Sequence, residues 1–596
     1  MKQRFYSAFI LIALSSCSGF LEEKQTTGLH DTVYSSEVML EANIYGIISG
    51  FSDTYGITGE PMEFFSQASA LTHWGGTSRL GKPKWDSVLK FTQYSTNDVN
   101  NKFFQIIYKG IDYCNVLLAN LPGSPVDEAF KRQIEAEAKF YRGVLYFNAV
   151  RIWGDLPLRT EVITVENSTN CPRSSYSKVY AQIVADFMDA AAGMRSPQEV
   201  RDNYKGTFRP DKFAPIAYLS SVYVTIGSLL SSQDDNFWDN AKEVRRPDFS
   251  PLGIVTADDA YRKALDCAES LIPESGIRNP ECRYQLVANY SDLFHFDPGY
   301  SSIAYDNPEQ IFVLNYTPQS GGGYHASRTL PQYCEGTLDC VETSRSGNTG
   351  RFRPNRWVFQ KWCETYPGTM KSGRYLSSSD PRLDATLYHS SIVNACNGAV
   401  TKIYPSVLEN KKVSVYPYFK KYWSSAYNMD TGTAAFYCMR FAEVYLNAAE
   451  AAAYLGQTQK AYDYVEVLHQ RARGTESEQP RWVTGQFKNK EELLSGIFWE
   501  RIFELYGEGH EWNEVHRHGA QWIIDNISIP KNEFLDRAES ADLRKSGSDQ
   551  KSYNSDFYYS TSVDEVRKGL LAAFPNNEFL YNKGISYDDQ NDYYFE

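Results

Sequence analysis

The chain has 596 residues, of which 42% are hydrophobic and 15% aromatic, and this composition excludes a disordered polymer. Its formal net charge of −13 argues against nucleic acid as a partner, because phosphates are bound by basic surfaces. The length alone suggests roughly four domains, although an all-helical array can form one continuous body of this size.

The first 16 residues carry the parts of an export signal in the right order. Lys2 and Arg4 precede a largely apolar stretch that ends at Leu14 and is too short to span a bilayer as a stable helix. Two serines then precede Cys17. This arrangement resembles the bacterial lipobox, which implies that Cys17 is lipidated and begins the mature protein. An ordinary signal peptide followed by a chance cysteine is the alternative.

No run of roughly eighteen apolar residues follows Leu14, so we expect the lipid on Cys17 to be the membrane anchor. Residues 17–27 lack a periodic pattern and are predicted to form an extended tether, and residues 28–596 a single body. Glu22 and Glu23 in the tether resemble the surface-export signal of Bacteroidetes lipoproteins, although acidic residues in a linker can also serve only solubility.

Apolar residues spaced at i, i+3, i+4 and i+7 predict helices through the first half of the body. In the first of them Phe103, Ile107 and Cys114 share one face, and Pro122 and Gly123 stop the pattern. The helices predicted at about 212–227 and 257–271 carry small residues that let helices approach closely. The predicted helices cover about 99–120, 127–152, 176–192, 212–227 and 257–271.

The same pattern returns near the end of the chain. Phe441 and Ala448 lie on one helical face, and Gly456 closes that helix. Thr458 is expected to cap a second helix, and a third covers about 489–506. Paired helices with small residues resemble the tetratricopeptide arrangement, although the period of about 34 residues is not kept strictly. The fold is therefore predicted to be mainly α, with helix pairs forming a scaffold.

The composition changes between about residues 274 and 436, where Ser, Asn and Pro are frequent and residues 321–323 are all glycine. Short apolar runs such as 311–316 predict a few short strands among irregular loops. Loops on a rigid frame commonly carry recognition, so this segment is predicted to be an irregular ligand-binding lobe. The scaffold is placed at about 99–273 and 437–525, and a Tyr-rich irregular region at about 541–596.

Several segments carry a recognisable pattern in a fixed order. They read AEAKFYRG at 136–143, RIWGDLPL at 151–158, MRFAEVYLNAAEA at 439–451, an ER, EL, EG, W and R series across 500–517, and YNKG at 581–584. Together they resemble the SusD/RagB family, the nutrient-binding outer-membrane lipoproteins of Bacteroidetes, across nearly the whole mature chain.

The resemblance implies tetratricopeptide-like helix pairs that carry an irregular ligand-binding lobe. It also implies a partner, a SusC-like TonB-dependent transporter over which the protein sits as a lid. Family members capture glycans at the cell surface, and some capture peptides.

The landmark segments also place charges inside apolar helices, where pairing would offset the cost of desolvation. We interpret these charges as structural in the first place, with ligand contact as the alternative. They are Glu137, Arg142, Arg440, Glu443, Glu500 and Arg501.

Chemistry-bearing motifs are few. His510, His516 and His518 lie near several glutamates, but the spacing is not that of the His-Glu-x-x-His zinc motif, so a structural cluster is preferred to a metal site. There is no Gly-x-Ser-x-Gly elbow and no phosphate-binding glycine loop. We therefore predict no catalytic residues, no metal and no cofactor.

The chain has ten cysteines, and lipid on Cys17 would leave an odd number without a Cys-x-x-Cys pair. Cys334 and Cys340 could bridge a loop in an oxidising compartment. Cys114, Cys267 and Cys438 fall in helical patterns and are predicted to be small buried side chains.

Sugar binding needs aromatic rings for the apolar face of the sugar and polar groups for its hydroxyl rim. The polar, glycine-rich segment 72–79, followed by Trp85 and Asp86, has this composition. A second group, Tyr324, His325, Arg328 and Trp357, lies in the predicted lobe. For each tryptophan, packing in the core is the alternative. The predicted contacts are Trp74, Arg79, Trp85, Asp86, Tyr324 and Trp357.

These observations predict a lipid-anchored protein of the outer membrane, facing the cell exterior, that captures a glycan and delivers it to a SusC-like transporter without catalysing a reaction. The alternative is an oligopeptide-binding lipoprotein of a RagA/RagB-like uptake system.

Overall fold

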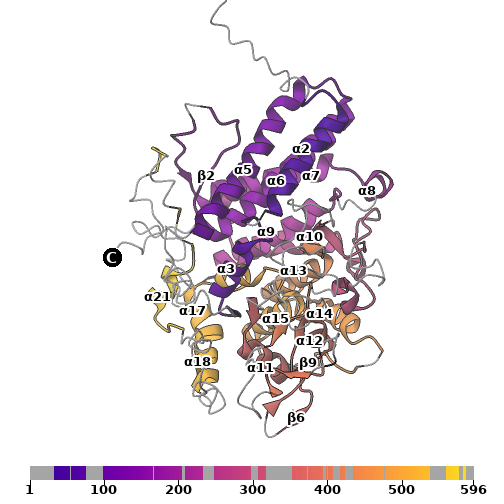
Figure 1. Ribbon diagram of the computed structural model, residues 1–596, viewed down its shortest axis with the longest axis vertical. Coiled ribbons are helices and arrows are strands. Elements are labelled where there is room, and N and C mark those ends of the chain that lie inside the picture. The colour runs from indigo at the N-terminus through magenta and orange to yellow at the C-terminus, as the bar shows by residue number, and fades with distance from the viewer. Residues whose placement is uncertain are drawn as a thin grey trace, which may run out of the picture.

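A computed structural model defines the architecture (Figure 1). It describes residues 33–53, 55–74, 98–164, 167–204, 209–232, 247–296, 306–316, 352–371, 374–393, 398, 400–406, 417–422, 434–475, 477–536, 559–572, 574–575 and 582–585. Cys17, the tether and the pair Cys334 and Cys340 lie outside these residues.

Long helices of the first part of the chain form one layer of the molecule (Figure 1). Asp127 begins α6, because its side chain accepts hydrogen bonds from the backbone N–H groups of Ala129 and Phe130. Gly143 of α6 lets α7 approach closely, since a Cβ there would lie 2.9 Å from the ring of Phe187. The long helices of this layer are α2 (Glu37–Phe51), α5 (Asp98–Asn120), α6 (Glu128–Trp153) and α7 (Tyr176–Gly193). The same part of the chain also forms the shorter helices α3 (Glu60–Ala68) and α8 (Pro197–Asn203).

A second set of helices packs beneath this layer, with α9 between α7, α10 and α13. Gly227 of α9 sits against Tyr261 of α10, where a Cβ would come within 2.7 Å of the ring, as expected for closely packed pairs. By length and hydropathy α9 could cross a membrane, but 83% of it is buried, which marks it as a core helix. The set comprises α9 (Ala214–Ser231), α10 (Ala257–Glu269), α13 (Phe441–Tyr454), α14 (Thr458–Arg473) and α15 (Lys490–Leu505).

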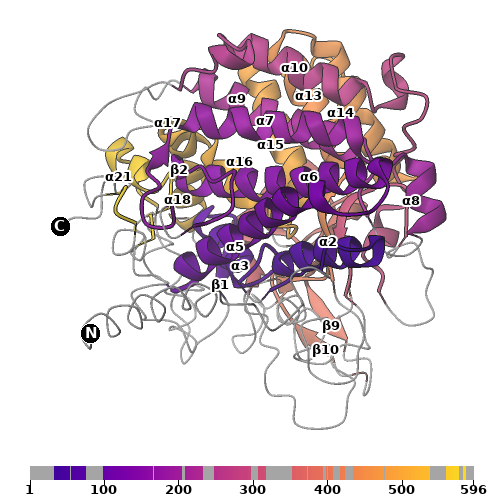
Figure 2. The ribbon, with the colours of Figure 1, turned by 90° about the horizontal axis from the view of Figure 1, so that it is seen from above.

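The strands pair two by two and antiparallel, and several join distant parts of the sequence. The pairs are β1 (Thr72–Trp74) with β5 (Phe352–Pro354), β2 (Leu156–Pro157) with β3 (Arg173–Ser174), β4 (Gln310–Leu314) with β12 (Phe436–Arg440), β6 (Met370–Lys371) with β7 (Arg374–Tyr375), β8 (Leu387–Tyr388) with β11 (Tyr418–Phe419), and β9 (Ser391–Val393) with β10 (Val400–Lys402). The β9–β10 hairpin projects from the body on the side away from α10 (Figure 2).

Short helices complete the body. They are α11 (Arg356–Thr365), α12 (Pro381–Thr386), α16 (Glu511–His516), α17 (Ala520–Ile523), a π-helical turn (Ile524–Ser528), α18 (Ile529–Asp536) and α21 (Val563–Lys568).

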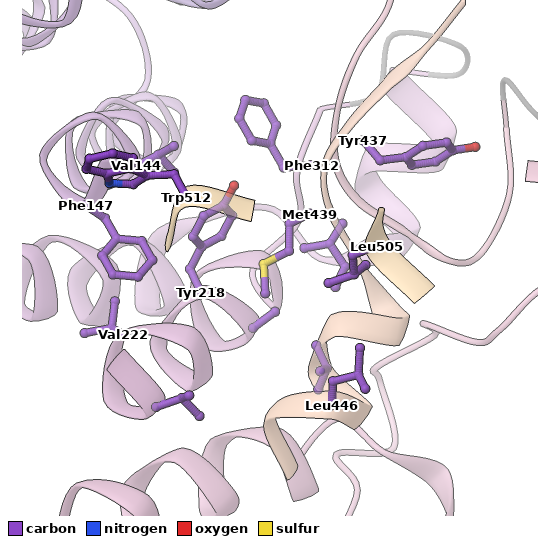
Figure 3. Close-up of a cluster of buried hydrophobic side chains, with 14 of the residues drawn as sticks. Val144, Phe147, Tyr218, Val222, Phe312, Tyr437, Met439, Leu446, Leu505 and Trp512 are labelled. Carbon is purple, nitrogen blue, oxygen red and sulfur yellow. The ribbon is translucent and has the colours of Figure 1, made fainter. Parts of the chain in front are cut away.

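The hydrophobic core lies where α6, α9, α13 and α15 meet the β4–β12 pair. Figure 3 shows the rings of Phe147, Tyr218 and Phe312 and the side chains of Met439 and Leu446 gathered there. Because residues of both layers enter one contiguous cluster, the helical scaffold and this pair of strands form a single packed unit.

A buried network of ion pairs crosses this core, and we call it the Arg440 network. Arg440, at the end of β12, contacts Glu309, Glu504 and Glu508 at 2.6–2.8 Å. Arg471 of α14 shares Glu309 and Glu504, and Arg382 of α12 binds Glu504 together with two further acids. The members are Glu309, Asp380, Arg382, Lys421, Arg440, Arg471, Glu500, Glu504 and Glu508, all buried.

The network sets the charge state of its acids. Burial alone would raise the pKa of Glu504, but the neighbouring cations Arg471, Arg440 and Arg382 outweigh it and hold this pKa well below its usual range. In the same way Arg382 and His469 hold the pKa of Glu500 at about 2 against the effect of burial. The carboxylates therefore stay ionised at neutral pH.

The other landmark charges are buried as well. Glu137 pairs with Arg195 and Arg209, Arg142 with Asp186, and Arg501 with Glu514. Glu443 accepts a hydrogen bond from Ser221 at 2.7 Å. The predicted pairing of embedded charges is thus confirmed for Glu137, Arg142, Arg440, Glu500 and Arg501.

The helices predicted from periodicity are all present within a few residues of their predicted ends, and the mainly α fold is confirmed. One predicted cap is wrong, because Thr458 is the first residue of α14, whereas Gln457 holds the cap position without a side-chain hydrogen bond. Cys438 lies on β12 and not on a helix. The region predicted as an irregular lobe contains α11 and α12, and the C-terminal region contains α21.

Removing one partner of a buried pair should cost far more than removing a surface charge on the same helix. Arg142 binds Asp186 through two hydrogen bonds of 2.7 and 2.9 Å. We expect Arg142→Ala to lower the free energy of unfolding by about 3–5 kcal/mol, because Asp186 stays buried without its cation. The measurement is urea unfolding of a soluble chain that begins at Ser18.

The matched control is Lys139→Ala, one turn earlier on α6. Lys139 pairs at 2.8 Å with Glu135 and Asp189, whose side chains are 47% and 59% exposed. Its removal should cost about 1 kcal/mol or less. Equal losses in the two variants would contradict a structural role for the buried pair.

Candidate ligand-binding site

The β1–β5 ladder pairs the strand that carries Trp74 with a strand of the predicted lobe. Trp74 pairs with Phe352 and His73 with Arg353 in antiparallel register. The first group continues along the chain from Trp74. Of the second group, Tyr324, His325 and Arg328 precede Phe352 and Trp357 follows it. The two paired strands are about 280 residues apart in sequence.

Most of the predicted contact residues lie beyond the ladder, outside the described residues. For Trp74 the strand is described and the ring is not. Arg79, Trp85, Asp86 and Tyr324 fall in 75–97 and 317–351, so their roles stay predictions, as do those of His325 and Arg328.

The base of the ladder is tied to the end of α15. The hydroxyl of Tyr506 donates to the backbone carbonyl of Leu71, the residue before β1, and accepts from the backbone N–H of Asn355 at 3.0 Å. That N–H also donates to the Leu71 carbonyl at 3.1 Å. Tyr506 is 1% exposed, so these backbone groups are satisfied away from water.

Asn355 adds a second constraint. Its side-chain oxygen accepts a hydrogen bond from the backbone N–H of Trp357 at 2.9 Å, and Asn355 thereby caps the N-terminus of α11. The residue after β5 is therefore fixed on both sides. The ladder and α11 consequently share one rigid junction.

Stacked rings support the ladder from below. The ring of Phe352 stacks on Phe419 of β11 with centroids 5.0 Å apart and planes at 16°, and Phe419 meets the edge of Tyr506 at 5.0 Å. Gly507 has φ +84° and touches Phe419, since a Cβ would lie 2.8 Å from its ring. Both the backbone angle and this close contact favour glycine there.

Arg353 belongs to the polar side of the same strand, with its guanidinium 4.8 Å from the ring centroid of Tyr418. The support of the ladder by β11 was not predicted from the sequence, although the aromatic run Tyr416-Pro417-Tyr418-Phe419 is a signal for it. The result is a short, rigid platform with buried rings on one side and a partly exposed arginine on the other.

Trp357 does not join this platform as an exposed ring. It lies on α11, is 5% exposed, and packs edge-to-face against Trp499 with centroids 5.3 Å apart. Its position favours the core-packing role that the sequence left open.

The histidines near the third landmark are also used in packing. His516 stacks on Trp512 at 3.6 Å, and one of its ring nitrogens lies 2.9 Å from the backbone oxygen of Trp512. Burial lowers the pKa of His516 to about 3, so the ring is neutral. Glu508 and Glu514 are held by cations. In the described part of the chain no group of three or more His, Cys, Asp or Glu side chains is placed to hold a metal.

Two family models match this chain in separate parts. One, described as "SusD family", matches residues 308–594, and the other, described as "Starch-binding associating with outer membrane", matches residues 19–224. Together they cover most of the chain, including all the landmark segments.

Relatives and solved structures agree over nearly full length. The SusD-like protein P25 of Formosa agariphila is 22% identical over 86% of this chain and 88% of its own length. A SusD homolog from Bacteroides thetaiotaomicron superimposes with a TM-score of 0.70 at 16% identity, covering 95% of this chain and 99% of that one. A laminarin-binding SusD-like protein does so with a TM-score of 0.60 at 19% identity, covering 92% and 98%.

Tyr506→Phe tests whether the ladder depends on the end of α15. The change removes one hydroxyl and leaves the Leu71 carbonyl and the Asn355 N–H less well satisfied in a buried place. We expect the free energy of unfolding to fall by about 1–3 kcal/mol. Tyr113→Phe, on a ring that is 46% exposed on α5, should change it by about 0.5 kcal/mol or less. Urea titrations of both variants decide this, and an unchanged Tyr506→Phe would contradict the anchoring role.

His516 should make the fold sensitive to acid. Its pKa is about 3 in the folded state against 6.5 when unfolded, so the unfolded chain binds the extra proton and stability falls as the pH drops from 6.5 towards 3. His516→Phe keeps a ring against Trp512 and cannot titrate.

The variant's free energy of unfolding should therefore fall less steeply, by about 1.4 kcal/mol per pH unit between pH 6 and 4. Unfolding titrations at several pH values provide the slopes. Parallel slopes for wild type and variant would show that His516 does not carry this dependence.

Proposed function

This chain belongs to the SusD/RagB family, and from that premise we propose that it captures a glycan at the cell surface and passes it to a SusC-like TonB-dependent transporter. The observation that supports the proposal is the β1–β5 ladder, which pairs the strand that ends at Trp74 with a strand of the predicted lobe on a rigid base. The laminarin-binding SusD-like protein, with the same fold over nearly its full length, supports a glycan as the ligand class.

The chemistry of the two segments suits a sugar. Trp74 and Trp85 would cover the apolar C–H face of a pyranose, while Arg79, Asp86 and Tyr324 would satisfy its hydroxyl rim. A rigid base matters here, because a platform that is already ordered loses less entropy when ligand binds.

No catalytic role is proposed. The carboxylates Glu500, Glu504, Glu508 and Glu514 are buried and held ionised by cations, so among the described residues these acids are not available as a general acid and base for glycoside hydrolysis. Capture and delivery require only binding.

The anchor completes the proposal. Lipid on Cys17 and a tether over residues 17–27 would hold the body at the outer membrane, and the matching family description, which refers to association with the outer membrane, supports that location. On the outer face of the membrane, the protein would bind polysaccharide before the polysaccharide reaches the transporter.

Calorimetry of a soluble chain that begins at Ser18, against plant, microbial and host glycans and peptide mixtures, tests the function. Saturable binding to one polysaccharide without release of smaller sugars is the expected result. Binding to peptides alone would instead support an oligopeptide-uptake lipoprotein, and formation of products would overturn the non-catalytic role.

Variants of three tryptophans separate binding from packing. Trp74→Ala and Trp85→Ala should abolish measurable glycan binding and leave the melting temperature unchanged, because their expected role is contact with ligand. Trp357→Ala should lower the free energy of unfolding by about 3–5 kcal/mol, because it opens a cavity beside Trp499. A large loss of stability in Trp74→Ala and Trp85→Ala would assign both rings to the core instead.

A further inference from the structure

A second cleft lies on the helical side of the molecule, away from the ladder. It occupies about 420 Å³ between the first half of α15, the end of α13 and the π-helical turn that follows α17. This volume falls within the range of about 300–1,000 Å³ that is typical of small-ligand pockets. Lys490, which lines the cleft, and Tyr506, which anchors the ladder, are about 24 Å apart along the axis of α15.

Aromatic rings supported from behind line this cleft. One face of Trp522 stacks on His518 at 4.2 Å, and the rings of Trp522 and Phe498 are arranged edge-to-face with centroids 4.7 Å apart. Tyr454 stacks on Tyr261 at 4.1 Å. Lys490, an exposed side chain, places its ammonium 3.7 Å from the ring centroid of Tyr454. Both rings are thus held in place by a neighbour and only partly buried.

Polar groups surround these rings. The π-helical turn Ile524–Ser528 carries Asp525 and Asn526 into the lining, and π-helical turns are frequent at functional sites. Gln521 donates to Asp525 at 3.0 Å and so orients one carboxylate oxygen. The Nε2 atom of His518 is buried and lacks a hydrogen-bond partner among the described residues. An unsatisfied nitrogen of this kind is a free position for a ligand hydroxyl or a water.

The lining carries two cations, Lys490 and Arg517, and three acids, Glu450, Glu491 and Asp525, so its formal charge is −1. Arg517 is occupied by Glu450 at 2.5 Å, while Lys490 faces the acids Glu491 and Asp525 across the same lining. The lining therefore does not favour an anion, and besides these charges it offers ring faces and side-chain amides.

We propose that this cleft is a second saccharide site, which binds one or two neutral pyranose residues against Trp522. The sugar's C–H face would lie on the ring, and Gln521, Asp525 and Asn526 would bind its hydroxyls. The ligand class follows from the lining itself, so the proposal does not require the ladder to bind sugar.

A larger cavity fits a sugar less well. It measures about 720 Å³ and lies between α8 and β4. Its two rings are Tyr204, which carries the guanidinium groups of Arg195 and Arg209 at 4.5 and 5.0 Å, and Tyr284, which is buried. Neither ring offers a free face to a ligand.

The test uses methyl pyranosides of neutral hexoses, pentoses and N-acetylhexosamines as probes, at millimolar concentration, with the soluble chain that begins at Ser18. Saturation-transfer NMR titrations give the dissociation constants. We expect at least one probe to bind wild type, and to bind Trp522→Ala about tenfold or more weakly. The Trp74→Ala, Trp85→Ala double variant should retain this binding, as should Tyr113→Ala on the far α5 surface.

Gln521→Ala provides a second variant, because this exposed amide can be removed without opening the core, and it should weaken the same probe several-fold. Thermal unfolding shows that each variant is folded. No probe bound by wild type, or equal binding by wild type, Trp522→Ala and Gln521→Ala, would overturn the second site. Binding lost only in the Trp74→Ala, Trp85→Ala variant would overturn it too, yet leave the proposed function intact.

Discussion

The Arg440 network is the constraint on which the rest of the structure depends. It joins the end of β12, α12 and α14 to the acids of α15, all away from water. A buried charge without its partner costs several kcal/mol, so any packing that shifts α15 by one turn would leave Glu500 or Glu504 unpaired. The network therefore selects one position for α15 among the many that its apolar surface alone would allow.

That position carries through to the platform. Tyr506 and Gly507 follow α15 directly and hold the Leu71 carbonyl, the Asn355 N–H and the ring of Phe419. Glu508, one residue further, returns to the network by pairing with Arg440 and Lys421. Within residues 504–508, Glu504 and Glu508 therefore hold the scaffold together, while Tyr506 and Gly507 hold the ladder. Landmark charges buried in the scaffold thus determine the position of the ladder.

Helices that depend on a local apolar pattern could be predicted from the sequence, whereas contacts between distant residues could not. Helices with one clear apolar stripe, such as α5 and α15, were predicted because their periodicity is visible in a short window. Helix α2 was missed, since Val38 and Tyr45 are 75% and 43% exposed while Leu40 and Ile44 are buried, and apolar residues on both sides hide the stripe. Helix α11 was missed because Gly, Ser and Pro dominate its surroundings. A single sequence carries no signal for the pairing of Trp74 with Phe352. A buried Arg440 must have acidic partners, but the sequence does not indicate which acids these are.

Helix α15 also relates the two proposed sugar sites, because Tyr506 anchors one and Lys490 lines the other on a single rigid rod. A polymer that occupies one site presents its next residues to the second at a high effective concentration, so its overall affinity exceeds that of either site. A short fragment cannot span about 24 Å of helix and gains nothing from the second contact. Weak sites held at a fixed separation would therefore retain long chains and release short ones, which fits the proposed capture of a polysaccharide and its delivery to a transporter.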